Sequence, residues 1–238
     1  MLRRIAALII AGTVAAGLIG VMAVPGGAQT TTTAGAGNLA TFCNARIALN
    51  QADGKKATLA GIDAMLTSVP APIAQPLQEL RTIYAKKGDR VFDDESGLQL
   101  LTTLDTYVYE NCPGTKVPVT AIDYEFQGVP PTLAAGTAQF KLTNNAPKEE
   151  HEMIVVKLTP EGEGQDLEKL LGLPEKKVGK FVDFSTATFM FAPAGQSGFS
   201  PASLETGTYV YACFVPVGGN KKGAPHFTEG MYGTFTVS

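Results

Sequence analysis

The chain has 238 residues, which is enough for one large domain or two small ones. Hydrophobic residues make up 45% of it, so it can bury cores, while 26 glycines and 15 prolines indicate short elements and many turns. The formal net charge is −3, and the basic residues are too scattered to form a phosphate-binding stripe, so we expect no nucleic-acid partner.

Residues 1–28 have the pattern of a signal peptide. Two arginines precede an apolar run over residues 5–24, and small residues suited to cleavage follow it. The pattern predicts export to the secreted or cell-envelope space, with no stable membrane insertion after cleavage. Because the run is long for a signal peptide, an uncleaved N-terminal membrane anchor is the alternative. Residues 29–37, rich in Thr, Gly and Ala, predict a disordered linker.

Residues 38–113 predict a small helical bundle. Apolar residues recur at helical spacing in four stretches, which are one starting near Asn38, Lys55–Thr67, Pro72–Lys87 and Asp94–Asn111. Short connections favour an up-down-up-down arrangement, which brings the start of the first helix and the end of the fourth to the same end. Cys43 and Cys112 lie near those two positions, so we expect a disulfide between them in an exported protein. The bundle contains no histidine and no catalytic motif.

Beyond residue 116 the sequence changes to short β-rich runs separated by Gly, Pro and Asn. The runs read VPVTAIDYEF, TAQFKLTNN, HEMIVVKL, ATFMFAP, GTYVYACFVP and MYGTFTV. Strands at this spacing indicate a β-sandwich or barrel. One amphipathic stretch, Gln165–Leu173, predicts a short helix between strands. The whole chain is therefore predicted to be an α+β multidomain protein, with the helical bundle followed by an all-β domain over 116–238.

Four residues of the β-rich half have the side chains that a copper site needs. The only two histidines of the chain are His151 and His226, and Cys213 is the one cysteine that the predicted disulfide leaves over. Met231 follows His226 closely. Two imidazoles, one thiolate and a weak thioether suit both oxidation states of copper. His151 opens a predicted strand, and the other three lie around the connection between the last two strands.

The stretch from Val117 to Ser238 resembles the cupredoxins, the group of plastocyanin, azurin and copper nitrite reductase. Residues 143–158 (TNNAPKEEHEMIVVKL) are similar to their first histidine motif. His226, Gly230, Met231 and Gly233 match the pattern H-x-x-x-G-M-x-G. The resemblance implies a Greek-key β-sandwich with one type 1 copper ion, held by His151, Cys213 and His226 in the equatorial plane and by Met231 as axial ligand. It implies electron transfer or copper handling, with a redox partner protein.

Two features depart from that family pattern. Twelve residues separate Cys213 from His226, which makes this loop long, and Glu152 stands where many cupredoxins have an Asn that braces the loop. With Glu149 and Glu150, it is expected to raise the pKa of His151 and weaken metal binding at mildly acidic pH. The alternative function is therefore a cupredoxin-fold scaffold without copper. An enzyme is not expected, because no histidine remains for a further copper site.

Overall fold

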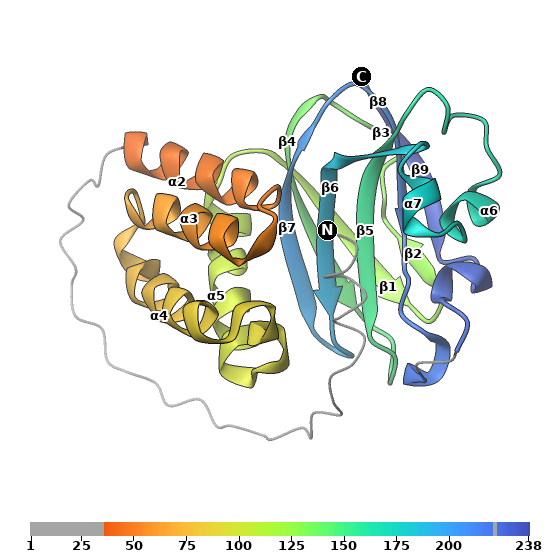
Figure 1. Cartoon of the computed structure of the whole chain (residues 1–238). Helices are drawn as coiled ribbons and strands as arrows, with labels where there is room; N and C mark the ends of the chain where they lie inside the picture. Colours follow the sequence, from red (N-terminus) through yellow and green to blue (C-terminus); the bar gives the residue numbers. More distant parts are fainter. Residues whose placement is uncertain (1–35, 221–222) are drawn as a thin grey trace.

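The computed structural model describes residues 36–220 and 223–238, and places a helical bundle beside a two-sheet β-sandwich (Figure 1). The predicted signal peptide, 1–28, and residues 29–35 of the predicted linker lie outside the described residues. The described part contains no helix with the length and apolarity needed to cross a lipid bilayer.

All four predicted helices are present. They are α2 (Ala36–Leu49), α3 (Gly54–Leu66), α4 (Ala71–Lys87) and α5 (Glu95–Asn111), and a short 3-10 turn, η1 (Gly88–Asp93), joins the last two. Gly88 ends α4 with φ of 59°, a backbone conformation that favours glycine. Asp94 caps α5, since its carboxylate accepts a hydrogen bond of 3.0 Å from the N–H of Gly97.

The predicted disulfide is confirmed. Cys43 in α2 is bonded to Cys112, which directly follows α5, with 5.7 Å between their Cα atoms. Both cysteines are buried in the core of the bundle, beside Phe42 and Val108. The bond therefore joins the first and last helices at one end of the bundle, as the up-down-up-down arrangement requires.

The second half forms two packed sheets, in agreement with the predicted sandwich. Their strands are β1 (Thr115–Ile122), β2 (Glu125–Gln127), β3 (Thr132–Leu133), β4 (Gly136–Asn144), β5 (His151–Leu158), β6 (Val182–Ala192), β7 (Ser197–Leu204), β8 (Gly207–Ala212) and β9 (Tyr232–Val237). One sheet has the order β2-β1-β4-β7, and the other has the order β3-β9-β8-β5-β6. The pairs β1–β4 and β3–β9 are parallel, and the others are antiparallel.

The insertion between β5 and β6 covers the outer face of the second sheet. The predicted helix at Gln165–Leu173 appears as α6 (Leu167–Leu171), and a second short helix that was not predicted, α7 (Glu175–Val178), follows it. Leu170 and Val178 pack with Val156 and Val210 of the sheet. This sheet is therefore apolar on both faces, which explains why β5 has a nearly continuous run of buried residues.

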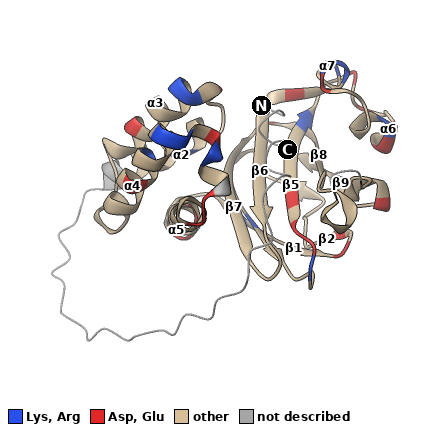
Figure 2. Cartoon of the chain, turned by 60° about the horizontal axis from the view of Figure 1, so that its bottom comes forward, with Lys and Arg blue, Asp and Glu red and all other residues tan. Residues whose placement is uncertain are grey.

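Strand β7 was not predicted, and it is the strand on which the bundle sits. Helices α2 and α5 pack against it at the open side of the sandwich, where β7 and β6 are edge strands of the two sheets (Figure 1). At the end of α2, Asn50 donates a hydrogen bond of 2.6 Å from Nδ2 to the carbonyl oxygen of Pro201 in β7. No charged residue lies in β7 (Figure 2). Because uncharged edge strands invite pairing with other chains, the bundle protects this edge.

Removing the disulfide tests how far it stabilises the bundle. A Cys43→Ala/Cys112→Ala variant loses a cross-link that spans 69 residues of sequence, which is worth about 4 kcal/mol in the chain-entropy model. We expect the free energy of unfolding, measured by urea titration with far-ultraviolet circular dichroism, to fall by roughly that amount. A loss well below about 1 kcal/mol would show that the bundle does not depend on it.

Candidate metal centre

Adjacent strands bring Cys213 and Met231 next to each other. Cys213 directly follows β8, and Met231 directly precedes β9. The register pairs Ala212 with Tyr232, so Cys213 stands opposite Met231, and the N–H of Cys213 donates to the carbonyl oxygen of Met231 at 3.1 Å. On the other side β8 pairs with β5, the strand that begins with His151.

The connection between β8 and β9 is fixed by its own backbone. The N–H of Phe227 donates to the carbonyl oxygen of Cys213 at 2.8 Å, and that of Met231 donates to His226 at 3.2 Å. His226 opens a 3-10 turn, η3 (His226–Glu229), which ends at Gly230 with φ of 100°. Because other residues rarely adopt that conformation, Gly230 allows the chain to turn from His226 to Met231 within one short loop.

Backbone contacts join the two sides of the long loop between Cys213 and His226. The N–H of Val217 donates to the carbonyl oxygen of Ala224 at 2.9 Å, and the neighbouring residues Pro216 and Pro225 form an antiparallel β-bridge. The N–H of His226 donates to Val215 at 2.9 Å, which closes the base of the insertion. Cys213 and His226 therefore lie close together in space, although twelve residues separate them in the sequence.

Three of the four predicted ligands converge through the atoms that bind metals. The Nδ1 atoms of His151 and His226 are 3.2 Å apart, and Cys213 Sγ lies 4.0 Å from the first and 3.4 Å from the second. The point equidistant from these three atoms is about 2.1 Å from each, which is close to the length of metal bonds to nitrogen and sulfur in comparable sites. The three donor atoms are therefore spaced as one shared ion would require.

Met231 is fully buried and stands next to both Cys213 and His226 through its backbone hydrogen bonds. Its role as the axial ligand stays a prediction.

Burial determines the protonation of the three converging side chains. None of them has exposed surface. Burial, together with the neighbouring His226, lowers the pKa of His151 to about 4, and burial also lowers the pKa of His226. Both imidazoles are therefore neutral near pH 7, with a lone pair available for a metal. Burial, with the charge of Glu152, raises the pKa of the Cys213 thiol to about 12, so metal binding must release its proton.

The expected influence of the glutamates on His151 was wrong in direction. Glu149, Glu150 and Glu152 were predicted to raise its pKa, but desolvation lowers it, and none of the three is among the groups that shift it. Glu149 faces the other histidine, with Oε2 at 3.4 Å from Nε2 of His226, and its Oε1 accepts a hydrogen bond from the N–H of Gly218. It therefore holds the insertion against His226.

Glu152 braces the site in place of the expected Asn. Its carboxylate accepts a hydrogen bond of 3.1 Å from the N–H of Phe214, the residue after Cys213. Its own N–H points at Cys213 Sγ from 3.5 Å. Burial raises the pKa of Glu152 to about 8. The same side chain thus positions the cysteine loop and stays neutral over much of the physiological pH range.

Two further residues of the site were missed by the sequence analysis. Asn144, which is fully buried, donates from Nδ2 to the carbonyl oxygens of Glu149 and Ala192, at 2.8 and 2.9 Å. Asn144 therefore fixes the segment that leads into His151. The two consecutive Asn residues of the TNN motif could have pointed to this role in the sequence. Tyr124 packs its ring edge-on against His226, with 4.9 Å between ring centres. Nothing in the sequence around Tyr124, which follows β1, indicated that it would contact His226.

The buried Glu152 predicts a pH dependence of stability. Its folded pKa lies above the ordinary value, so its contribution is complete below about pH 4.5 and is lost as pH rises through about 8. In the metal-free protein, a Glu152→Gln variant keeps an acceptor for Phe214 but cannot ionise. We expect the stability of the wild type relative to this variant to fall by roughly 1.4 kcal/mol per pH unit across that window. Urea titrations at several pH values measure it, and a constant difference would contradict the prediction.

Comparisons with known proteins find similarity only at the level of structure. No family model and no curated protein matches the sequence. Among solved structures, a dithionite-reduced auracyanin from Roseiflexus castenholzii shares 20% identity with a TM-score of 0.36, and covers 52% of this chain and 98% of its own. Auracyanin A, a "blue" copper protein from Chloroflexus aurantiacus, shares 20% identity with a TM-score of 0.36, and the match covers 53% of this chain and 100% of auracyanin A.

Rusticyanin from Thiobacillus ferrooxidans is similar at 20% identity and a TM-score of 0.31, over 53% of this chain and 79% of its own. These values are too low to transfer a function, so any function must be argued from the site itself. The description of the second half as a β-sandwich of two sheets rests on its own strand order.

Proposed function

We propose that this protein binds one copper ion in a type 1 site and carries single electrons outside the cytoplasm. The observation that carries the proposal is the convergence of His151 Nδ1, His226 Nδ1 and Cys213 Sγ around one point, with all three side chains buried. Two imidazoles and one thiolate in a trigonal arrangement are the donor set of electron-transfer copper sites.

The surrounding residues support a rigid site. The backbone hydrogen bonds that join Cys213, His226 and Met231 fix their loop at both ends, and Asn144 fixes the approach to His151. Met231, opposite Cys213, is the residue proposed to supply the weak axial thioether. Copper would supply one-electron redox chemistry, and the protein's part is to hold these donors in one geometry for both oxidation states.

We propose an electron carrier rather than an enzyme. The chain has two histidines, and both belong to this one site, so a catalytic copper site of the kind built from several imidazoles has no ligands here. A carrier of this kind requires a redox partner protein. The predicted signal peptide, 1–28, and the disulfide of the bundle support an extracytoplasmic location, because disulfides persist in oxidising compartments.

Adding copper(II) to the purified protein tests the site. We expect an intense thiolate-to-copper absorption band in the visible and an electron paramagnetic resonance signal with narrow hyperfine splitting. A Cys213→Ser variant should keep its circular dichroism spectrum and lose the intense band, because the hydroxyl group does not replace the thiolate. If the wild type, with Cys213 reduced, showed neither signal, the protein would instead be a cupredoxin-fold scaffold without copper.

The axial role of Met231 has a matched control. Met153 is equally buried in the core of the sandwich, but it lies within β5. Replacing Met231 by Leu removes a donor that favours the oxidised ion, so we expect the reduction potential to rise by about 59 mV or more, a tenfold change in the one-electron equilibrium. Met153→Leu should leave it nearly unchanged. Equal potentials in both variants, measured by voltammetry, would remove Met231 from the ligand set.

A further inference from the structure

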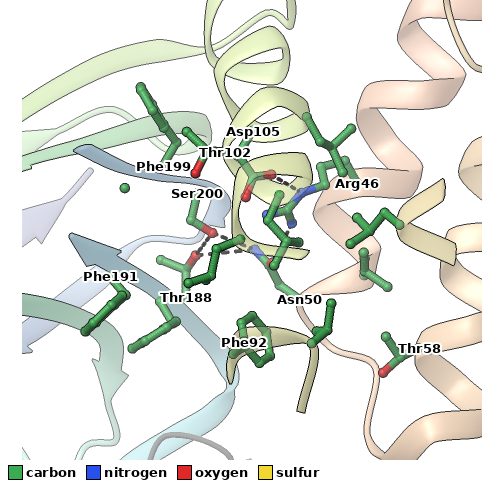
Figure 3. A pocket seen from close by; sticks show the side chains of 18 of the residues that line it. Arg46, Asn50, Thr58, Phe92, Thr102, Asp105, Thr188, Phe191, Phe199 and Ser200 are labelled. Carbon is green, nitrogen blue, oxygen red and sulfur yellow. Dashed lines mark hydrogen bonds and ion pairs between the residues drawn. The ribbon is translucent and has the colours of Figure 1, made fainter. Parts of the chain in front are cut away.

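A cavity lies between the bundle and the sandwich, apart from the metal centre. Its volume is about 290 Å³ (Figure 3). Residues of α2, α3, α4, η1 and α5 line one side of it, and residues of β5, β6 and β7 line the other. It therefore exists only where the two halves of the chain meet, and neither half forms it alone.

Most of the wall of this cavity is apolar. Its lining includes Leu49, Ile62, Leu101, Ile154, Phe189 and Phe199. Apolar cavities do not hold water well, and their lining atoms lose packing contacts when nothing fills them. A void of this size is about twice the 150 Å³ cavity that binds benzene in a well-studied case, so it has room for roughly twelve non-hydrogen atoms. Occupancy by an apolar molecule would restore those contacts.

One end of the cavity is polar and has unused hydrogen-bonding capacity. The side chain of Arg46 is only 9% exposed, and it donates from Nε to Asp105 Oδ1 at 2.8 Å and from Nη1 to Asn50 Oδ1 at 2.7 Å (Figure 3). Among the described residues, Arg46 Nη2 and Asp105 Oδ2 make no hydrogen bond. Neither atom is among the fully enclosed polar atoms without a partner, so both are open to a group that enters the cavity.

The charges at this end favour a neutral ligand. Arg46 and Asp105 balance each other, so a charged group entering the cavity would lose its hydration without meeting a net opposite charge. A carbonyl oxygen can accept from Arg46, and a hydroxyl group can also donate to Asp105. A second cavity, of about 230 Å³ beneath α6 and α7, is lined by apolar side chains only and offers no such anchor.

We propose that the cavity between the two halves is a binding site for a neutral small molecule with a hydrocarbon or aromatic body and one carbonyl or hydroxyl group. The polar group lies against Arg46 and Asp105, and the body fills the space between α5 and strands β6 and β7. The proposal does not depend on copper, because the metal ligands take no part in the cavity.

Binding of 2-nonanone to the full protein tests the proposal directly. We expect a dissociation constant of about 1 mM or lower, in the range usual for ligands of this size. Nonylammonium, of equal size but charged, should bind at least about tenfold more weakly because it must bury its charge beside Arg46. Two-dimensional NMR follows both titrations, and the shifted amides should belong to α2, α5, β6 and β7.

Two variants identify the site, and the first of them has a matched control. Leu98 lines the cavity, and Leu167 of α6 is equally half-buried but lines neither cavity. Leu98→Phe should weaken binding of 2-nonanone at least about tenfold by filling space, whereas Leu167→Phe should not change it. An Arg46→Met/Asp105→Leu double variant replaces the whole ion pair, avoids an unpaired charge, and should weaken binding about tenfold.

Three outcomes would overturn the proposal. The first is the absence of saturable binding by folded protein. The second is a set of amide shifts confined to α6, α7 and the sheet beneath them. The third is equal affinity for 2-nonanone and nonylammonium, which would leave no role for the ion pair.

Discussion

The structure buries three polar side chains with metal-ligating atoms together, beside the apolar core of the sandwich. His151, Cys213 and His226 have no exposed surface, and among the described residues Nε2 of His151 lacks a hydrogen bond, while Nε2 of His226 has only Glu149 Oε2 nearby, at 3.4 Å. Burial of this kind costs free energy, and it lowers the pKa of both imidazoles and raises that of the thiol. A cation bound between the three donors, as proposed above, would offset that cost.

The sequence predicted the helices better than the strands. Apolar spacing and end signals such as Asp94 and Gly88 are local, so all four helices could be located from neighbouring residues. Strand β7, SGFSPASL, was missed because its Gly, Ser and Pro residues are typical of loops. It is stable as a strand because β4 pairs with it on one side and the bundle covers the other, where Asn50 satisfies the carbonyl group of Pro201. Those partners are distant in sequence, and no local pattern contains them.

The ligand set could be predicted because the residues are so few. With two histidines and one unpaired thiol, their order along the chain was enough to select them, and the structure brings those three together. Their environment could not be predicted in the same way. Glu149 and Glu150 are close to His151 in sequence, but proximity does not give side-chain direction, and desolvation outweighs any effect of their charge. The support from Asn144 and Tyr124 depends on folds of the chain that bring separate segments together.

The helical bundle has a structural connection to the metal centre through strand β6. Asn50 at the end of α2 donates to Thr188 of β6 at 3.3 Å, and Thr188 pairs with Val155 of β5. Four residues further along β6, Ala192 pairs with His151, the first residue of β5. The disulfide ties together the bundle that carries Asn50, and Asn50 is the bundle residue that holds β6 by a hydrogen bond. Because Ala192 of β6 is the strand partner of His151, a contact that holds β6 in place also supports the position of His151.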